Sequence, residues 1–363
     1  MTSPAPFAPP AYAPAAPPQP RPLPADATSG GLAFHRLVFA RKRRGWWTPL
    51  AVGGLALAFY VAMLLLVTGI MIAVALADPS FLDRMTALGQ NPSFDLKDPV
   101  MLVFLLGTII LMLPAYVLAS LIVNGKRIGL ISSAAGRLRW RWMLVCTGVA
   151  LALSAVLTGL SFVIPGEAGD GGAPEPNPLW VVSLVLILLL VPLQSAAEEY
   201  IFRGYLMQAI GRWLRHPAFA ILLPVPLFVL GHLYDVLGQI SVGMFAVAAG
   251  WLTWRTGGLE AAIALHVVNN LTGFLVSLAL GSDPTESETG WMSFLWSFVL
   301  IGGYVALVEW MLRRRAARGN PLPRTVVLTP PPAPPVPAWP APAWPAPAAP
   351  DGYAATSSAS RIV

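Results

Sequence analysis

The chain has 363 residues, of which 56% are hydrophobic and only 11% are charged, and it carries a formal net charge of +6. Soluble domains usually contain about 25% charged residues, so this chain has too few charges to cover a surface that faces water. An ordinary soluble domain is therefore excluded. The single cysteine, Cys146, also excludes disulfides and cysteine-based metal sites within the chain.

Both ends of the chain are rich in proline. Residues 1–30 contain ten prolines and lack the apolar segment of a signal peptide, and residues 320–350 contain thirteen more prolines. Such segments lack the side chains to build a core, so we expect residues 1–34 and 319–363 to form disordered tails. We interpret the tails as linkers; the alternative is that proline-recognising domains bind them.

Long apolar segments follow one another between the tails. Eight intervals contain no Asp, Glu, Lys or Arg, and each is close to or above the roughly 20 residues that a helix needs to cross a bilayer. The sequence therefore predicts an all-α, polytopic membrane protein with about eight transmembrane helices in residues 35–318. A buried helix or a re-entrant pair is the alternative for the two shortest intervals, 216–234 and 236–254. The other six intervals are 45–77, 99–125, 142–166, 176–197, 261–282 and 289–308.

The connections between these segments alternate in charge. Because positively charged loops stay on the cytoplasmic side, the alternation predicts a multi-pass protein of the cell membrane with both termini in the cytoplasm. It also argues against nucleic acid as a partner, and the expected surroundings are the lipid bilayer. The basic stretches, which contain no acidic residue, are Arg36–Arg44, Lys126–Arg141, Arg212–Arg215, Arg255 and Arg313–Arg318, and the other connections hold eleven acidic residues and two basic ones.

The first polar motif that interrupts an apolar segment runs from Glu198 and Glu199 to Arg203. If the helix continues through this motif, Glu199 and Arg203 lie four residues apart on one face and can pair. Arg212 then marks the cytoplasmic border, which places Glu198 about 21 Å deeper at 1.5 Å per residue. A charge near the bilayer centre costs about 2.5–3.5 kcal/mol, so it needs a reason. The alternative is a helix end at the membrane surface with an ordinary ion pair.

Two further motifs place polar residues at a similar depth. His232 follows Phe228 by four residues and His266 precedes Asn270 by four, so each pair shares a helix face. Each motif alone is explained by a satisfied core histidine or by a polar contact between helices. Three segments that carry such residues within about one and a half helical turns of one depth instead indicate a single polar chamber.

The residue types in this chamber limit its chemistry. The sequence lacks H-E-x-x-H, has no Ser-His-Asp set at matching depth and has no pair of aspartates within the apolar segments. A carboxylate that has lost its water shell suits a general base toward water. Histidine and asparagine side chains can donate hydrogen bonds to the tetrahedral oxyanion of peptide hydrolysis. These residue types suit an intramembrane hydrolase; a proton-coupled transporter that uses the buried Glu and His residues and a non-catalytic membrane scaffold are the alternatives.

The order and spacing of the three motifs resemble those of the CPBP family. These are the CAAX-processing and bacteriocin-processing intramembrane endopeptidases, also known as Abi proteins or glutamic-type CAAX prenyl proteases. The motifs are Glu-Glu-x-x-x-Arg, Phe-x-x-x-His and His-x-x-x-Asn on successive apolar segments, and the resemblance covers about residues 178–280. It implies a CAAX-type endopeptidase that cleaves a membrane-anchored protein or peptide with glutamate-activated water.

The resemblance also implies catalytic roles. Glu198 would activate the water with help from His232, and His266 and Asn270 would form the oxyanion site. We expect no cofactor, although Glu198, His232 and His266 are also a possible set of zinc ligands.

Three supporting residues complete the resemblance. Glu199 and Arg203 would orient the helix and the cavity, and Phe228 would pack behind His232. The run before Phe228 departs from many members of the family, because it contains two prolines where they carry small or hydroxyl residues. We expect these prolines to change the helix geometry before His232.

Overall fold

The computed structural model of the chain describes residues 23–90, 96–125, 128–161, 163–164, 177–281 and 289–329. Seven of the helices in these ranges are long and apolar enough to cross a membrane, which confirms an all-α, polytopic membrane protein. The seven are α2 (Thr48–Ala77), α4 with α5 (Pro99–Ile110 and Met112–Asn124), α6 (Trp140–Ser161), the continuous segment Trp180–Trp213, α11 (Val236–Thr256), α12 (Glu260–Leu280) and α13 (Trp291–Ala317). The shorter α3 (Pro79–Gln90) and η2 (Ile128–Ile131) lie in connections.

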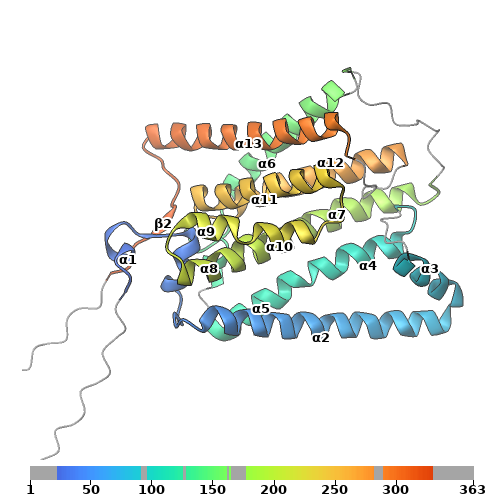
Figure 1. Cartoon of the computed structure of the whole chain (residues 1–363), viewed down its shortest axis with the longest axis horizontal. Helices are drawn as coiled ribbons and strands as arrows, with labels where there is room; N and C mark the ends of the chain where they lie inside the picture. The colour runs from blue at the N-terminus through green and yellow to red at the C-terminus, as the bar shows by residue number, and fades with distance from the viewer. Residues whose placement is uncertain are drawn as a thin grey trace, which may run out of the picture. The chain divides into compact units, whose positions relative to one another are not determined.

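The long helices lie side by side and form one bundle (Figure 1). α12 contacts α6, α7 (Trp180–Glu199) and α11, so it lies inside the bundle, whereas α2 packs mainly against α5. Small residues allow this close packing: Ala261, Ala262 and Ala264 on α12 are fully buried or nearly so in the largest apolar cluster. The two helices that carry the glutamate pair and His266 therefore pack directly on each other.

The interval 216–234 differs from the single span that was expected. It contains two short helices, α9 (Pro217–Leu222) and α10 (Val225–Leu230), and together they cover only about 21 Å at 1.5 Å per residue. The physical reason is the pair Pro224 and Pro226, because proline has no backbone N–H and disrupts the preceding helical turn. The described residues therefore hold seven helices of spanning length rather than eight, although α9 and α10 still run alongside the long helices (Figure 1).

The chain segments that precede and follow the helical bundle pair with each other. β1 (Leu32–Ala33) pairs antiparallel with β2 (Thr325–Val326), and the 3₁₀-helix η1 (Phe34–Ala40) packs on α8 (Met207–Trp213). We call residues 26–40 together with 320–328 the terminal clasp. The expected tail boundaries, at residues 34 and 319, thus fall within structured chain.

The clasp is ordered because its sequence differs from the rest of the tails. Leu32, Phe34 and Leu37 are fully buried, and Arg36 forms an ion pair with Asp26 of α1 (Asp26–Ser29). Proline is absent from residues 25–40, so backbone pairing and helix formation are open to this stretch. The parts of the expected tails before residue 23 and after residue 329 lie outside the described residues.

Candidate active site

The glutamate pair lies within a long helix rather than at its end. α7 continues into a π-helical segment, η3 (Tyr200–Leu206), and then into α8, so that the apolar helix runs unbroken for 34 residues from Trp180 to Trp213. Glu198 and Glu199 directly precede the π-helical segment. Such segments are rare and are often found at functional sites, because the wider turn changes the direction of the side chains around it.

Glu199 is the centre of a buried ionic group. One of its oxygens, Oε1, accepts hydrogen bonds from Arg203 Nη1 at 2.7 Å and from His266 Nδ1 at 2.8 Å. The Glu199 and Arg203 side chains are 0% and 3% exposed, and Arg203 also lies over the ring of Phe228 at 4.5 Å and donates to the carbonyl of Ala246. The pairing predicted from the four-residue spacing is therefore confirmed.

His266 stands between the two glutamates. Because a carboxylate oxygen can only accept, the bond to Glu199 assigns the proton to Nδ1 of His266. The other nitrogen, Nε2, lies 3.4 Å from Oε2 of Glu198. That oxygen is buried and has no hydrogen-bond partner among the described residues, and the Glu198 side chain is 12% exposed. Oε2 of Glu199 is also buried without a partner among the described residues, but its Oε1 accepts two hydrogen bonds, so Glu198 is the less engaged of the two carboxylates.

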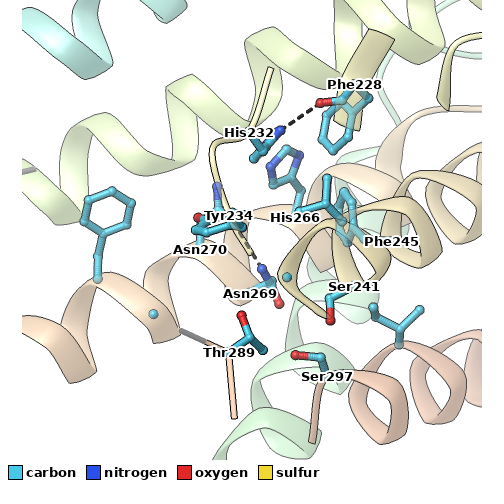
Figure 2. Close-up of a pocket in the computed structure, with 15 residues that line it drawn as sticks. Phe228, His232, Tyr234, Ser241, Phe245, His266, Asn269, Asn270, Thr289 and Ser297 are labelled. Carbon is cyan, nitrogen blue, oxygen red and sulfur yellow. Dashed lines mark hydrogen bonds between the residues drawn. The ribbon is translucent and has the colours of Figure 1, made fainter. Parts of the chain in front are cut away.

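His232 reaches the site from the end of α10. Its Nδ1 bonds to the carbonyl of Phe228 at 2.8 Å (Figure 2), so Nδ1 is the donor in this bond. The other ring nitrogen, Nε2, is not used in it. The Phe228 ring packs against the imidazole at a centroid distance of 4.8 Å, as was expected of a residue behind His232. The side chain of Gln239, on α11, donates to the backbone carbonyl of His232 and so fixes the backbone that follows α10.

Asn270 belongs to a chain of side-chain amides. Its Nδ2 donates to Oε1 of Gln194 at 3.2 Å, and its Oδ1 accepts from Nδ2 of Asn269 at 3.2 Å. Gln194 also accepts from Ser195 Oγ at 3.3 Å. Our interpretation of the sequence missed Gln194 and Asn269. Gln194 precedes Glu198 by four residues, so its position on the same helix face was the available signal.

A cavity of about 240 Å³ opens beside these groups. Phe228, His232, His266 and Asn270 line it, and Figure 2 shows the two imidazoles at one end. Glu198, Glu199 and Arg203 do not line the cavity, because they lie behind His266. The structure therefore brings the predicted residues together in two layers, with histidine and amide groups at the cavity wall and the ionic group behind them.

The described residues do not form a ready metal site. No group of three or more His, Cys, Asp or Glu side chains is positioned to hold a metal ion in the described part of the chain. The bonds of both Nδ1 atoms, to Glu199 and to the Phe228 carbonyl, leave Nε2 of each histidine as the nitrogen that could coordinate a metal. The possible zinc set Glu198, His232 and His266 stays a prediction.

Comparison with known proteins agrees with the motif order. Residues 177–272 match the Rce1-like family of type II CAAX prenyl endopeptidases. The uncharacterized protein YyaK of Bacillus subtilis (strain 168) is 34% identical over 100 residues, which cover 26% of this chain. The matched segment spans about a third, 33%, of the length of that curated relative. No solved structure matches the chain significantly.

Proposed function

We propose that the chain, whose residues 177–272 match the Rce1-like family of type II CAAX prenyl endopeptidases, hydrolyses a peptide bond of a membrane-associated protein or peptide within the bilayer. The observation that carries this proposal is the Glu198 carboxylate. Its Oε2 is buried and has no hydrogen-bond partner among the described residues, yet it lies 3.4 Å from His266 Nε2. A buried carboxylate oxygen with spare acceptor capacity suits proton abstraction from water.

The pairing within the ionic group supports Glu198 as the base. Arg203 Nη1 and His266 Nδ1 both donate to Oε1 of Glu199, so these donors are committed to that carboxylate. Oε2 of Glu198 receives no hydrogen bond from the described residues, so its lone pairs can accept a proton from water.

Hydrolysis then proceeds in two steps. Because Glu198 lies behind the cavity wall, a water molecule must pass His266 to reach it. Glu198 takes a proton from this water while the water oxygen attacks the peptide carbonyl carbon. The resulting oxyanion accepts hydrogen bonds from Asn270 Nδ2 and, once Nε2 carries a proton, from His266. The C–N bond then breaks as the proton held by Glu198 passes to the leaving nitrogen. His232 Nε2, whose partner nitrogen donates to Phe228, accepts a hydrogen bond from the same water and orients it.

The charge alternation of the sequence supports a location in the cell membrane with both termini in the cytoplasm. The terminal clasp is consistent with this assignment, because it brings the first and last described segments together at one end of the bundle. Two termini on one side need an even number of crossings, and α9 with α10 makes the eighth in this assignment. Arg212 bonds to the carbonyls of Arg44 and Gly45 at the same end. We expect the lipid bilayer to surround the bundle, no nucleic acid to bind, and proline-recognising domains to be possible partners of the tails.

The test is cleavage of a quenched-fluorescence peptide library by the purified protein in proteoliposomes. The library includes peptides with and without a prenylated C-terminal cysteine motif. Glu198→Gln keeps the shape of the side chain but removes the base, so we expect cleavage to fall by about 10²–10⁴-fold. Glu309→Gln is the control, because Glu309 also lies in a long helix but pairs with Arg255 and Arg313 away from the cavity.

The possible results separate the alternatives. Cleavage by Glu198→Gln at the wild-type rate would refute the proposed base. Cleavage that a chelator abolishes would require metal chemistry that we do not assign. If no peptide is cleaved and Glu198→Gln lowers the midpoint temperature of thermal unfolding, Glu198 serves a structural role and the protein is a membrane scaffold.

A further inference from the structure

The cavity extends well beyond the two histidines. On α12 its lining runs from His266 to Phe274, and His266 and Gly273 are two helical turns or about 10 Å apart. α11 contributes Ser241 to the wall, and α13 contributes Ser297 (Figure 2). An extended peptide advances about 3.3 Å per residue, so the far end of the cavity lies two or three residues from a peptide bond held at His266.

The far end of the cavity is polar but uncharged. Hydroxyl and amide groups of Ser241, Ser297 and Asn269 line it together with the apolar side chains of Phe274 and Ile301, and no Asp, Glu, Lys or Arg is among the lining residues that the structure describes. The hydroxyl oxygen of Ser241 is buried and has no hydrogen-bond partner in the described part of the chain. A buried hydroxyl without a partner is costly, and a ligand that offers one removes this cost.

Gly273 leaves this end open. A Cβ atom at Gly273 would meet no other atom within 4 Å, so the absence of a side chain here enlarges the cavity and is not required by close packing. Its φ angle is not positive, so the backbone accepts other residues. Gly273 therefore determines how deep the cavity is.

From these features, and resting on the proposed function, we propose that the far end of the cavity binds an uncharged, hydrogen-bonding substrate side chain. This side chain belongs to a residue two or three positions from the scissile bond. Glutamine and asparagine carry both the donor and the acceptor that the wall can pair with. A glutamate or lysine side chain at this position is disfavoured, because the described wall offers no opposite charge to offset the loss of water.

The experiment uses peptides that differ only at positions two and three on each side of the cleaved bond, with Gln, Glu, Lys or Ala. We expect kcat/KM for the Gln peptide to exceed that of the Glu and Lys peptides by about tenfold or more, on one side of the bond only. Gly273→Leu fills the cavity and should lower kcat/KM of the Gln peptide by about tenfold. The Ala peptide should be cleaved as before.

Gly148→Leu is the matched control, since Gly148 is an exposed glycine of α6 whose Cβ would also meet nothing, away from the cavity. If Glu198-dependent cleavage occurs but the charged peptides are cleaved as well as the Gln peptide, or Gly273→Leu changes nothing, the subsite proposal is wrong and the proposed function stands.

A binding measurement decides the case in which no peptide is cleaved. Fluorescence anisotropy of the same peptides, labelled at one end, is measured with the Glu198→Gln protein, with and without Gly273→Leu. Tighter binding of the Gln peptide that Gly273→Leu abolishes would support the subsite even though the proposed hydrolysis had failed. Equal binding of all the peptides would overturn it.

Discussion

The ion pair between Arg139 and Glu260 allows a direct test of how α6, α12 and the terminal clasp are held together. Glu260 begins α12, its side chain is 0% exposed, and it accepts hydrogen bonds from the backbone N, Nε and Nη2 of Arg139 at 2.8, 2.8 and 2.6 Å. Nη1 of Arg139 donates to the carbonyls of Thr256 and Pro323, both at 3.0 Å. One guanidinium thus joins the starts of α6 and α12 to the terminal clasp.

Glu260→Ala should destabilise the protein strongly. It leaves the Arg139 side chain, which is only 9% exposed, without a counter-charge, and loss of one partner from a buried pair costs about 3–5 kcal/mol. At roughly 2–4 °C per kcal/mol this predicts a fall of about 6–20 °C in the midpoint of thermal unfolding. The midpoint is measured by tryptophan fluorescence of the protein in detergent. Proteolytic activity at low temperature should remain, because the pair does not line the cavity.

Arg313→Met is the matched control for this prediction. Arg313 also pairs with a carboxylate, that of Glu309 at 3.1 Å, but its side chain is 77% exposed. Solvent screening limits such a pair to at most about 0.5 kcal/mol, so the midpoint should hardly move. Equal shifts in the two variants would show that burial does not govern the strength of these pairs, and the reasoning would fail.

Asn270→Ala should lower kcat by about 10²-fold or more and leave KM nearly unchanged, because an oxyanion donor acts in the transition state; a change in KM alone would contradict this role. Gly257→Ala should cost about 1–3 kcal/mol in thermal unfolding, since φ is +72° and the new Cβ would lie 2.5 Å from Cα of Arg324. Burial lowers the pKa of His35 below 6.5, against the opposing hydrogen bond to the Arg215 carbonyl, so the stability of the clasp is full above pH 6.5 and is lost as the pH falls below it. Hydrogen exchange of residues 26–40, corrected for intrinsic rates, should therefore speed up between about pH 7.5 and 5.5, and His35→Gln should remove this change.

Membrane helices could be predicted because their signal is local. An apolar interval of about 20 residues has one dominant explanation, and interval 236–254, one of the two doubtful ones, became the long helix α11. The interval 216–234 met the same length rule but contains Pro224 and Pro226, whose effect on backbone hydrogen bonds an apolar count ignores. Composition also did not predict the terminal clasp, because the clasp depends on pairing between residues nearly 300 positions apart.

The spacing of the motifs predicted which side chains would lie close together, but not which atoms would bond to one another. Four-residue spacing correctly placed Arg203 against Glu199. It could not show that His266 would bond to Glu199 and face Glu198 with its second nitrogen, since that depends on how α12 packs on α7. The catalytic roles of Glu198, His232, His266 and Asn270 stay predictions, and the variants Glu198→Gln and Asn270→Ala test two of them.

The two adjacent glutamates have different environments, and this difference supports the different roles that we propose for them. Glu199 is engaged by Arg203 and His266, so its charge is compensated and its position is fixed. Among the described residues, the Glu198 carboxylate contacts Nε2 of the same imidazole at 3.4 Å. In the proposed mechanism Glu199 is therefore the positioning residue, because it holds Arg203 and Nδ1 of His266. Glu198 is the base in that mechanism, because its Oε2 keeps lone pairs that no described donor takes.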